Sequence, residues 1–292
     1  MKIQTQCVPC LLKRIIFEAE LSTKNPKIKT KVIRNACKVI SDLYDPNGCS
    51  ATIATEVHRM VYETLGEDDP YKDLKNKSNK VAISLVPKVE KLIEESNDPL
   101  KMSMLCSIVG NTMDFGIEGV STHPEKLKDI FEEKVDDGLG YDGSARLKKL
   151  LKKSKNVLLF TDNCGEIVFD KILCRELKKF NQKMFLTLVV KGKPILSDAT
   201  IEDAEKIYFE DVVDKILTTG CFAVGVDFNK IPSELNNKFK QVDLIICKGM
   251  ANYESFSETN YRPIAYLMRT KCEPIARSMN VPVNINAIKL YE

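Results

Sequence analysis

A carboxylate, an amide and a glycine lie together where a short apolar run gives way to a helical pattern. Residues 157–160 predict a buried strand, and Asp162, Asn163 and Gly165 follow it directly. Apolar side chains then recur at helical spacing over 168–180. Ligands bind at the carboxyl ends of strands in open α/β sheets. Asp and Asn oxygens suit a hard divalent cation, and a helix amino terminus favours an anion. The segment therefore predicts a site for a metal ion and an anion.

Polar residues also follow three further predicted strands, which span 185–190, 215–218 and 242–247. Asp198 comes after the first of them, Thr219 and Gly220 after the second, and Lys248 after the third. Carboxyl ends of parallel strands meet at one edge of a sheet, so these groups are expected to face a common crevice. Each segment alone is more typical of a turn or a helix cap. The convergence of four segments favours a functional site.

The residue types at this edge suit phosphoryl transfer. Asp162 and Asp198 would repel each other without a cation, and with Asn163 they offer three oxygen ligands to Mg²⁺ or Mn²⁺, with Co²⁺ or Ni²⁺ as alternatives. Such a metal polarises a phosphoryl oxygen and activates water. Lys248 is expected to stabilise charge on the phosphoryl group, and the backbone N–H groups of 218–220 to cradle its oxygens. Water attack is favoured over an aspartyl-phosphate route, because all three side chains are wanted as metal ligands.

Composition narrows the class of protein. The 292 residues carry 44 basic and 41 acidic side chains, a net charge of +3, which gives no reason to expect nucleic-acid binding. No apolar run approaches the ~20 residues that span a membrane. The amino terminus lacks the apolar core of a signal peptide, so a cytoplasmic, reducing location is expected. The ten cysteines are then thiols or metal ligands rather than disulfides.

Two patterns of apolar residues divide the chain. Helical spacing dominates 1–150 and predicts an all-helical amino-terminal subdomain. Strand-like runs, including two further ones at 264–268 and 283–288, alternate with helical ones over 151–292, which predicts an α/β domain with a mostly parallel sheet and helices on both faces. The predicted boundary falls in the turn-rich segment 136–150.

Motifs along nearly the whole chain resemble one known family, the metal-dependent damage-control phosphatases of the ARMT-like (acidic residue methyltransferase-like) family. More narrowly, the chain resembles the archaeal and bacterial branch with an amino-terminal Cys-x-x-Cys. The matching segments are 7–10, 110–116, 161–170, 194–204, 219–220, 248–254 and 271–276.

This resemblance implies a helical subdomain followed by a Rossmann-like, three-layer α/β/α domain. It implies a metal ion held by Asp162, Asn163 and Asp198, and a phosphate-contacting lysine at Lys248. It also implies hydrolysis of small phosphoesters, including sugar phosphates and damaged phosphometabolites.

Further polar residues are candidates for the substrate pocket. They are Asn111, Asp114, Glu166, Asn252 and Glu254, in addition to Thr219 and Gly220. Asn111 and Asp114 close the helical half, where they either reach over the metal or form a polar helix end that packs the two subdomains together.

The sequence does not decide the roles of several cysteines and of the two histidines. Cys7 and Cys10 have the spacing of half a zinc site or of a redox pair, and buried structural thiols are the competing reading. Cys37, Cys49 or Cys272 could complete a metal site only if the fold brings them close. His58 and His123 belong to no recognisable constellation and are expected to be structural or exposed.

The sequence thus predicts a divalent-metal-dependent phosphatase for a small phosphorylated metabolite. One alternative is an S-adenosylmethionine-dependent carboxyl methyltransferase, which a Rossmann-like sheet permits. The usual glycine-rich loop after the first strand of the domain is missing, however, since only Gly165 stands there. The other alternative is a non-enzymatic module that binds phosphometabolites in the same crevice.

Overall fold

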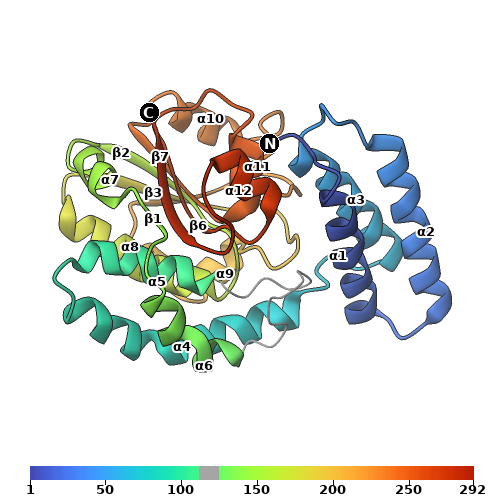
Figure 1. The fold of residues 1–292 in the computed structure, drawn as a ribbon, viewed down its shortest axis with the longest axis horizontal. Coiled ribbons are helices and arrows are strands. Elements are labelled where there is room, and N and C mark those ends of the chain that lie inside the picture. The colour runs from blue at the N-terminus through green and yellow to red at the C-terminus, as the bar shows by residue number, and fades with distance from the viewer. Residues whose placement is uncertain (112–124) are drawn as a thin grey trace.

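The computed structural model describes residues 1–111 and 125–292 (Figure 1). Asp114 and His123 lie outside the described residues.

Three amino-terminal helices form a lobe of their own at one end of the molecule (Figure 1). They are α1 (Cys7–Ser22), α2 (Pro26–Leu43) and α3 (Ser50–Leu65). In α2 the side chain of Asn25 accepts a hydrogen bond from the N–H of Lys27, and Pro26 occupies the first turn, which is a favourable helix start. Val32, Ala36 and Ile40 recur at helical spacing and are buried against the other two helices.

The next three helices pack beside the sheet instead of joining this lobe. They are α4 (Lys72–Glu94), α5 (Pro99–Gly110) and α6 (Lys126–Asp136). Helix α4 continues through Pro87, and α4 and α5 both contact α8 (Glu166–Phe180) of the α/β part. The division at residue 150 stays a prediction, although the helices before it contribute both to the lobe and to a layer on the sheet.

Seven strands form one mostly parallel sheet, which confirms the predicted fold class. Their order is β1-β7-β6-β5-β2-β3-β4, and β7 is antiparallel to β6. The strands are β1 (Tyr141–Asp142), β2 (Asn156–Phe160), β3 (Phe185–Val190), β4 (Lys215–Thr218), β5 (Leu244–Lys248), β6 (Ile264–Arg269) and β7 (Asn286–Tyr291).

Helices cover both faces of the sheet, so the α/β part has three layers (Figure 1). Leu159 and Ile246 share one core with α4, α5 and α8, whereas Leu158 and Ile245 share the other with helices α10, α11 and α12. This alternation along each strand is that of a sheet buried on both faces. The remaining helices are α7 (Ser144–Leu151), α9 (Ile201–Glu205), the 3₁₀ turn η1 (Phe209–Asp211), α10 (Ser233–Phe239), α11 (Gly249–Phe256) and α12 (Glu273–Met279).

The chain reverses its direction of travel across the sheet beside β2. From β2 it proceeds to β3 and β4 on one side and then crosses to β5, which pairs with β2 on the other side. The carboxyl ends of β2 and β5 therefore flank a topological switch point, the place where ligands bind in doubly wound folds.

Candidate active site

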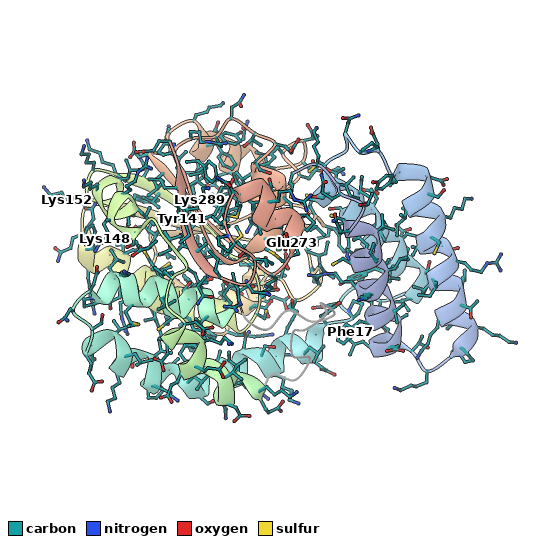
Figure 2. The ribbon with its side chains drawn as sticks, viewed as in Figure 1. Phe17, Tyr141, Lys148, Lys152, Glu273 and Lys289 are labelled. Carbon is teal, nitrogen blue, oxygen red and sulfur yellow. The ribbon has the colours of Figure 1, made fainter. Side chains whose placement is uncertain are left out.

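A cavity of about 350 Å³ lies at this edge of the sheet, between the helical lobe and the α/β part. Asp162, Asn163, Asp198 and Glu254 contribute to its wall. Glu273 of α12, labelled in Figure 2, lines it as well. From the lobe, the lining includes Cys7, Cys10, Leu11, Arg14, Ala54 and His58. The cavity thus brings together the three predicted metal ligands and a wall that belongs to a different part of the fold.

Asp162 is buried and is held by two amide groups. Its Oδ2 accepts hydrogen bonds from Nδ2 of Asn111 at 2.8 Å and from Nδ2 of Asn163 at 2.7 Å. Gly249, the first residue of α11, lies against the same carboxylate with a φ of +73°. A Cβ atom at Gly249 would lie 1.9 Å from that Oδ2, so the carboxylate occupies space that only a glycine leaves open.

Asn163 and Asp198 are joined by an isolated antiparallel bridge between the loops that follow β2 and β3. The hydroxyl of Ser197 donates to Oδ1 of Asn163 at 2.6 Å. Oδ2 of Asp198 lies 3.2 Å from Nζ of the buried Lys191, which also donates to the carbonyl of Gly225 at 2.6 Å. Sequence reasoning missed Lys191, because a lysine just after a strand is usually exposed and nothing local marks its partner.

Lys248 lies beneath the site and not in the wall of the cavity. Its Nζ is fully buried, forms an ion pair with Asp170 at 2.7 Å and a second one with Glu166, and donates to the carbonyl of Ser107 at 3.2 Å. Glu166 also accepts hydrogen bonds from Nδ2 of Asn111 and from the N–H of Asn163. Lys248 is therefore linked to the Asp162 carboxylate through Glu166 and Asn111.

Burial and neighbouring charges shift the pKa values of Glu166 and Lys248 in this network. Burial raises the pKa of Glu166 to about 7, even though Lys248 beside it favours the ionised form. Burial lowers the pKa of Lys248, but the carboxylates of Asp170 and Glu166 outweigh it, and the net pKa lies above the ordinary value. The two carboxylates therefore favour the charged form of Lys248.

The other expected pocket residues are dispersed. Thr219 accepts a hydrogen bond from the N–H of Gly192 at 3.0 Å, and Gly220 beside it is exposed with a φ of +81°. Asn252 is buried and donates to the carbonyls of Thr161 and Lys248 at 2.9 and 2.8 Å. Among the described residues that line the cavity, only Glu254 comes from this group.

The donor set at the cavity fits a hard divalent cation. Two carboxylates and one amide oxygen are the ligands that Mg²⁺ and Mn²⁺ accept, and the glycine-limited space beside Asp162 keeps its carboxylate at the cavity wall. Within 1–111 and 125–292, no three His, Cys, Asp or Glu side chains form a group that could hold a metal ion. Any metal here would depend on the amide of Asn163.

Three thiols share the cavity wall, namely Cys7, Cys10 and Cys272. Although they line one cavity, they are not among any group of three His, Cys, Asp or Glu side chains in the described residues that could hold a metal ion, so the metal-site reading of the pair gains no support. Burial raises the pKa of Cys7, and it raises that of Cys272 to about 12, so both sulfurs are held as neutral thiols.

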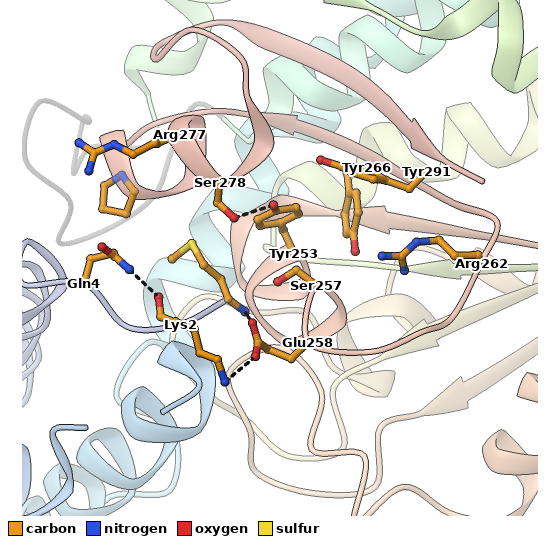
Figure 3. A pocket seen from close by; sticks show the side chains of 12 residues that line it. Lys2, Gln4, Tyr253, Ser257, Glu258, Arg262, Tyr266, Arg277, Ser278 and Tyr291 are labelled. Atoms are coloured by element: carbon orange, nitrogen blue, oxygen red, sulfur yellow. Dashed lines mark hydrogen bonds and ion pairs between the residues drawn. The ribbon is translucent and has the colours of Figure 1, made fainter. Parts of the chain in front are cut away.

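A second cavity, of about 470 Å³, opens beside α11, α12 and the sheet edge (Figure 3). Its wall includes Tyr253, Tyr266, Arg262 and Ser278, and the hydroxyls of Tyr253 and Ser278 lie 2.8 Å apart. None of the predicted site residues is among the described residues that line it, so it is not the predicted site.

The fold and the site define an α/β protein with a helical lobe and an Asp-Asn-Asp cluster at the switch point of its sheet. The sequence matches the Damage-control phosphatase ARMT1-like domain over residues 3–285, and the chain belongs to that family. The family resemblance in the sequence is thereby confirmed.

Curated relatives match over their full length. A protein of Archaeoglobus fulgidus named "Damage-control phosphatase" is 40% identical over 292 residues, covering 100% of both chains. One of Pyrococcus horikoshii, "Damage-control phosphatase PH1575", is 31% identical over 97% of this chain and 96% of its own. The crystal structure of a DUF89 family protein of Pyrococcus horikoshii superposes with a TM-score of 0.89 at 29% identity, covering 100% of both chains.

In the described part of the chain, every helix is too short or too polar to cross a membrane.

Proposed function

We propose that this protein is a divalent-metal-dependent phosphatase that hydrolyses small phosphorylated metabolites. The observation that carries the proposal is the convergence of Asp162, Asn163 and Asp198 on one cavity at the switch point of the sheet. Membership of the damage-control phosphatase family supports the reaction class. The volume, about 350 Å³, suits a ligand the size of a sugar phosphate.

In this proposal Asp162, Asn163 and Asp198 hold the metal ion. Bound there, a divalent cation supplies charge stabilisation for a phosphoryl oxygen and lowers the pKa of water. Asn111 orients Asp162 through its amide, and Lys191 orients Asp198. Both contacts keep the carboxylates in place before substrate arrives, which is the preorganisation that catalysis needs.

Lys248 contributes its charge through the network behind the site. Its Nζ is occupied by two carboxylates and a carbonyl, so we assign it to holding Glu166, and Glu166 to holding Asn111 and the Asn163 backbone. The direct phosphate contact expected from the sequence is replaced in this proposal by an indirect one. Asn252 supports the same loops by joining the ends of β2 and β5.

Metal-restored phosphate release tests the proposal. Chelator-treated protein would be assayed on sugar phosphates and p-nitrophenyl phosphate with and without added Mg²⁺, Mn²⁺, Co²⁺ or Ni²⁺. We expect turnover that requires metal and is lost in Asp162→Asn, while Asp73→Asn, an exposed aspartate of α4, retains it. Metal-independent release, or equal activity in the two variants, would refute the metal site. Methyl transfer to a carboxylate without phosphate release would favour the methyltransferase alternative.

A further inference from the structure

A buried carboxylate–imidazole pair lies in the helical lobe beside the candidate active site. Nδ1 of His58 in α3 is 3.0 Å from Oε2 of Glu18 in α1, and the residues are 1% and 0% exposed. The other carboxylate oxygen, Oε1, has no partner among the described residues. Burying such a pair costs desolvation free energy that two apolar side chains would avoid.

Two hydrogen bonds, one on each side of His58 along α3, join this face of the helix to loops of the α/β part. The hydroxyl of Thr55 accepts a hydrogen bond from the N–H of Val224 at 2.9 Å. The hydroxyl of Tyr62 accepts one from the N–H of Leu196, also at 2.9 Å, two residues before Asp198. Thr55, His58 and Tyr62 share one helix face, so His58 stands between two contacts that dock the lobe on the loops after β3 and β4.

The second ring nitrogen of His58 is available to a ligand. The residue lines the same cavity as Asp162 and Asp198, and its Nε2 makes no hydrogen bond to any described residue. Since Nδ1 is engaged by Glu18, Nε2 is the nitrogen left for a ligand. Among the described residues, no three His, Cys, Asp or Glu side chains form a group that could hold a metal ion, so His58 is not part of such a group. A hydroxyl group of a ligand is therefore a better partner for Nε2 than a metal ion.

We propose that His58 contacts the substrate, with Nε2 accepting a hydrogen bond from a hydroxyl group on its organic part. Glu18 acts as a positioning residue that fixes the orientation of the imidazole ring. The inference rests on the proposed phosphatase function and adds to it a residue that contacts the organic part of the substrate. The sheet edge binds the phosphate end in this arrangement, and the lobe binds the hydroxylated end.

The test compares ligands with and without hydroxyl groups. Because His58→Leu alone would leave Glu18 buried and unpaired, Glu18→Gln/His58→Leu is compared with Glu18→Gln and with wild type. For a hexose phosphate we expect kcat/KM to fall about 10-fold in the double variant, the effect of one lost hydrogen bond, and to fall clearly less for p-nitrophenyl phosphate, which has no hydroxyl group to contact Nε2. His58→Gln, which places an amide near Nε2, should recover part of the loss.

Calorimetry with a hexose phosphonate and with phenylphosphonate, which are not hydrolysed, measures binding affinity for a ligand with hydroxyl groups and for one without them. A loss of affinity confined to the hexose phosphonate supports the contact. Equal losses for both ligands, or none, would overturn it, provided that circular dichroism shows folded protein. If wild type releases no phosphate but the phosphonates still discriminate, the proposed function fails while the His58 contact stands.

Discussion

A Cβ atom built on Gly249 would lie 1.9 Å from Oδ2 of Asp162. The Asp162 carboxylate therefore leaves no room for a side chain at Gly249, the first residue of α11. The two residues follow the adjacent strands β5 and β2. Their contact therefore limits where the carboxylate of Asp162, a predicted metal ligand, can lie at the switch point of the sheet.

Gly249→Ala is therefore expected to displace the Asp162 carboxylate. Activity and metal affinity should fall at least about 10-fold, because a small displacement of a ligand weakens a preorganised site. The matched control is Gly66→Ala, at the same φ of +73° with nothing within 4 Å of the added atom. Both substitutions carry the same backbone strain, so metal titration and urea unfolding separate strain from the steric effect. Similar metal affinities in the two variants would contradict the prediction.

Lys191→Met should destabilise the protein, because it removes a buried ammonium that lies 3.2 Å from the Asp198 carboxylate. Removing one partner of a buried pair costs about 3–5 kcal/mol in free energy of unfolding. Lys193→Met, at an exposed position two residues away, serves as the control in urea denaturation. If a divalent cation binds Asp198, adding it should recover part of the loss. A change confined to activity would show that Lys191 does not support Asp198 structurally.

Lys248→Met tests the indirect role of Lys248. Its ammonium forms buried ion pairs with Glu166 and Asp170, so the variant is expected to lose about 3–5 kcal/mol of folding stability as well as activity. A lysine that served only to bind phosphate would affect turnover and leave the unfolding midpoint unchanged. Thermal melts recorded beside the phosphate-release assay decide between the two.

Asp203 should contribute to stability in a pH-dependent way. Burial would raise its pKa, but the Lys75 ammonium 3.1 Å away and the capping contacts from Thr200 outweigh burial, so the pKa is lowered from 3.8. A lowered pKa gives stability that is present above pH 3.8 and is lost as the pH falls through the folded-state value. Asp203→Asn should cost about 1 kcal/mol at neutral pH, the value of a helix cap, and less in acid.

The control for Asp203→Asn is Glu202→Gln, an exposed neighbour in α9. Guanidinium denaturation of the three proteins at a series of pH values gives the comparison. A difference between wild type and Asp203→Asn that grows as the pH falls would show the opposite sign and contradict the assignment.

The sheet was largely predictable from the sequence. Five of its strands, β2 to β6, were expected within two residues of their observed bounds, because buried parallel strands are short apolar runs separated by helical patterns. The two-residue strand Tyr141–Asp142 is too short to show any periodicity. The expected strand 283–288 forms as Asn286–Tyr291, since Asn284 has a φ of +61° and belongs to the preceding turn.

The site was predictable only where it depends on strand ends. Asp162, Asn163 and Asp198 meet because the carboxyl ends of parallel strands meet. The burial of Lys248 depends on the packing of α5 against α8, which no local pattern records. His58 was expected to be structural or exposed, and its partner Glu18 lies 40 residues away on another helix. Such pairs arise from the tertiary arrangement and have no signal at fixed spacing.

The cavity wall is divided between the helical lobe and the edge of the sheet, so docking of the lobe and occupancy of the cavity are thermodynamically linked. Any ligand that touches both walls must favour the docked arrangement by its own binding free energy. The amides of α1 to α3 should then exchange their hydrogens more slowly in the presence of such a ligand, while a ligand held by the sheet edge alone would leave their exchange unchanged.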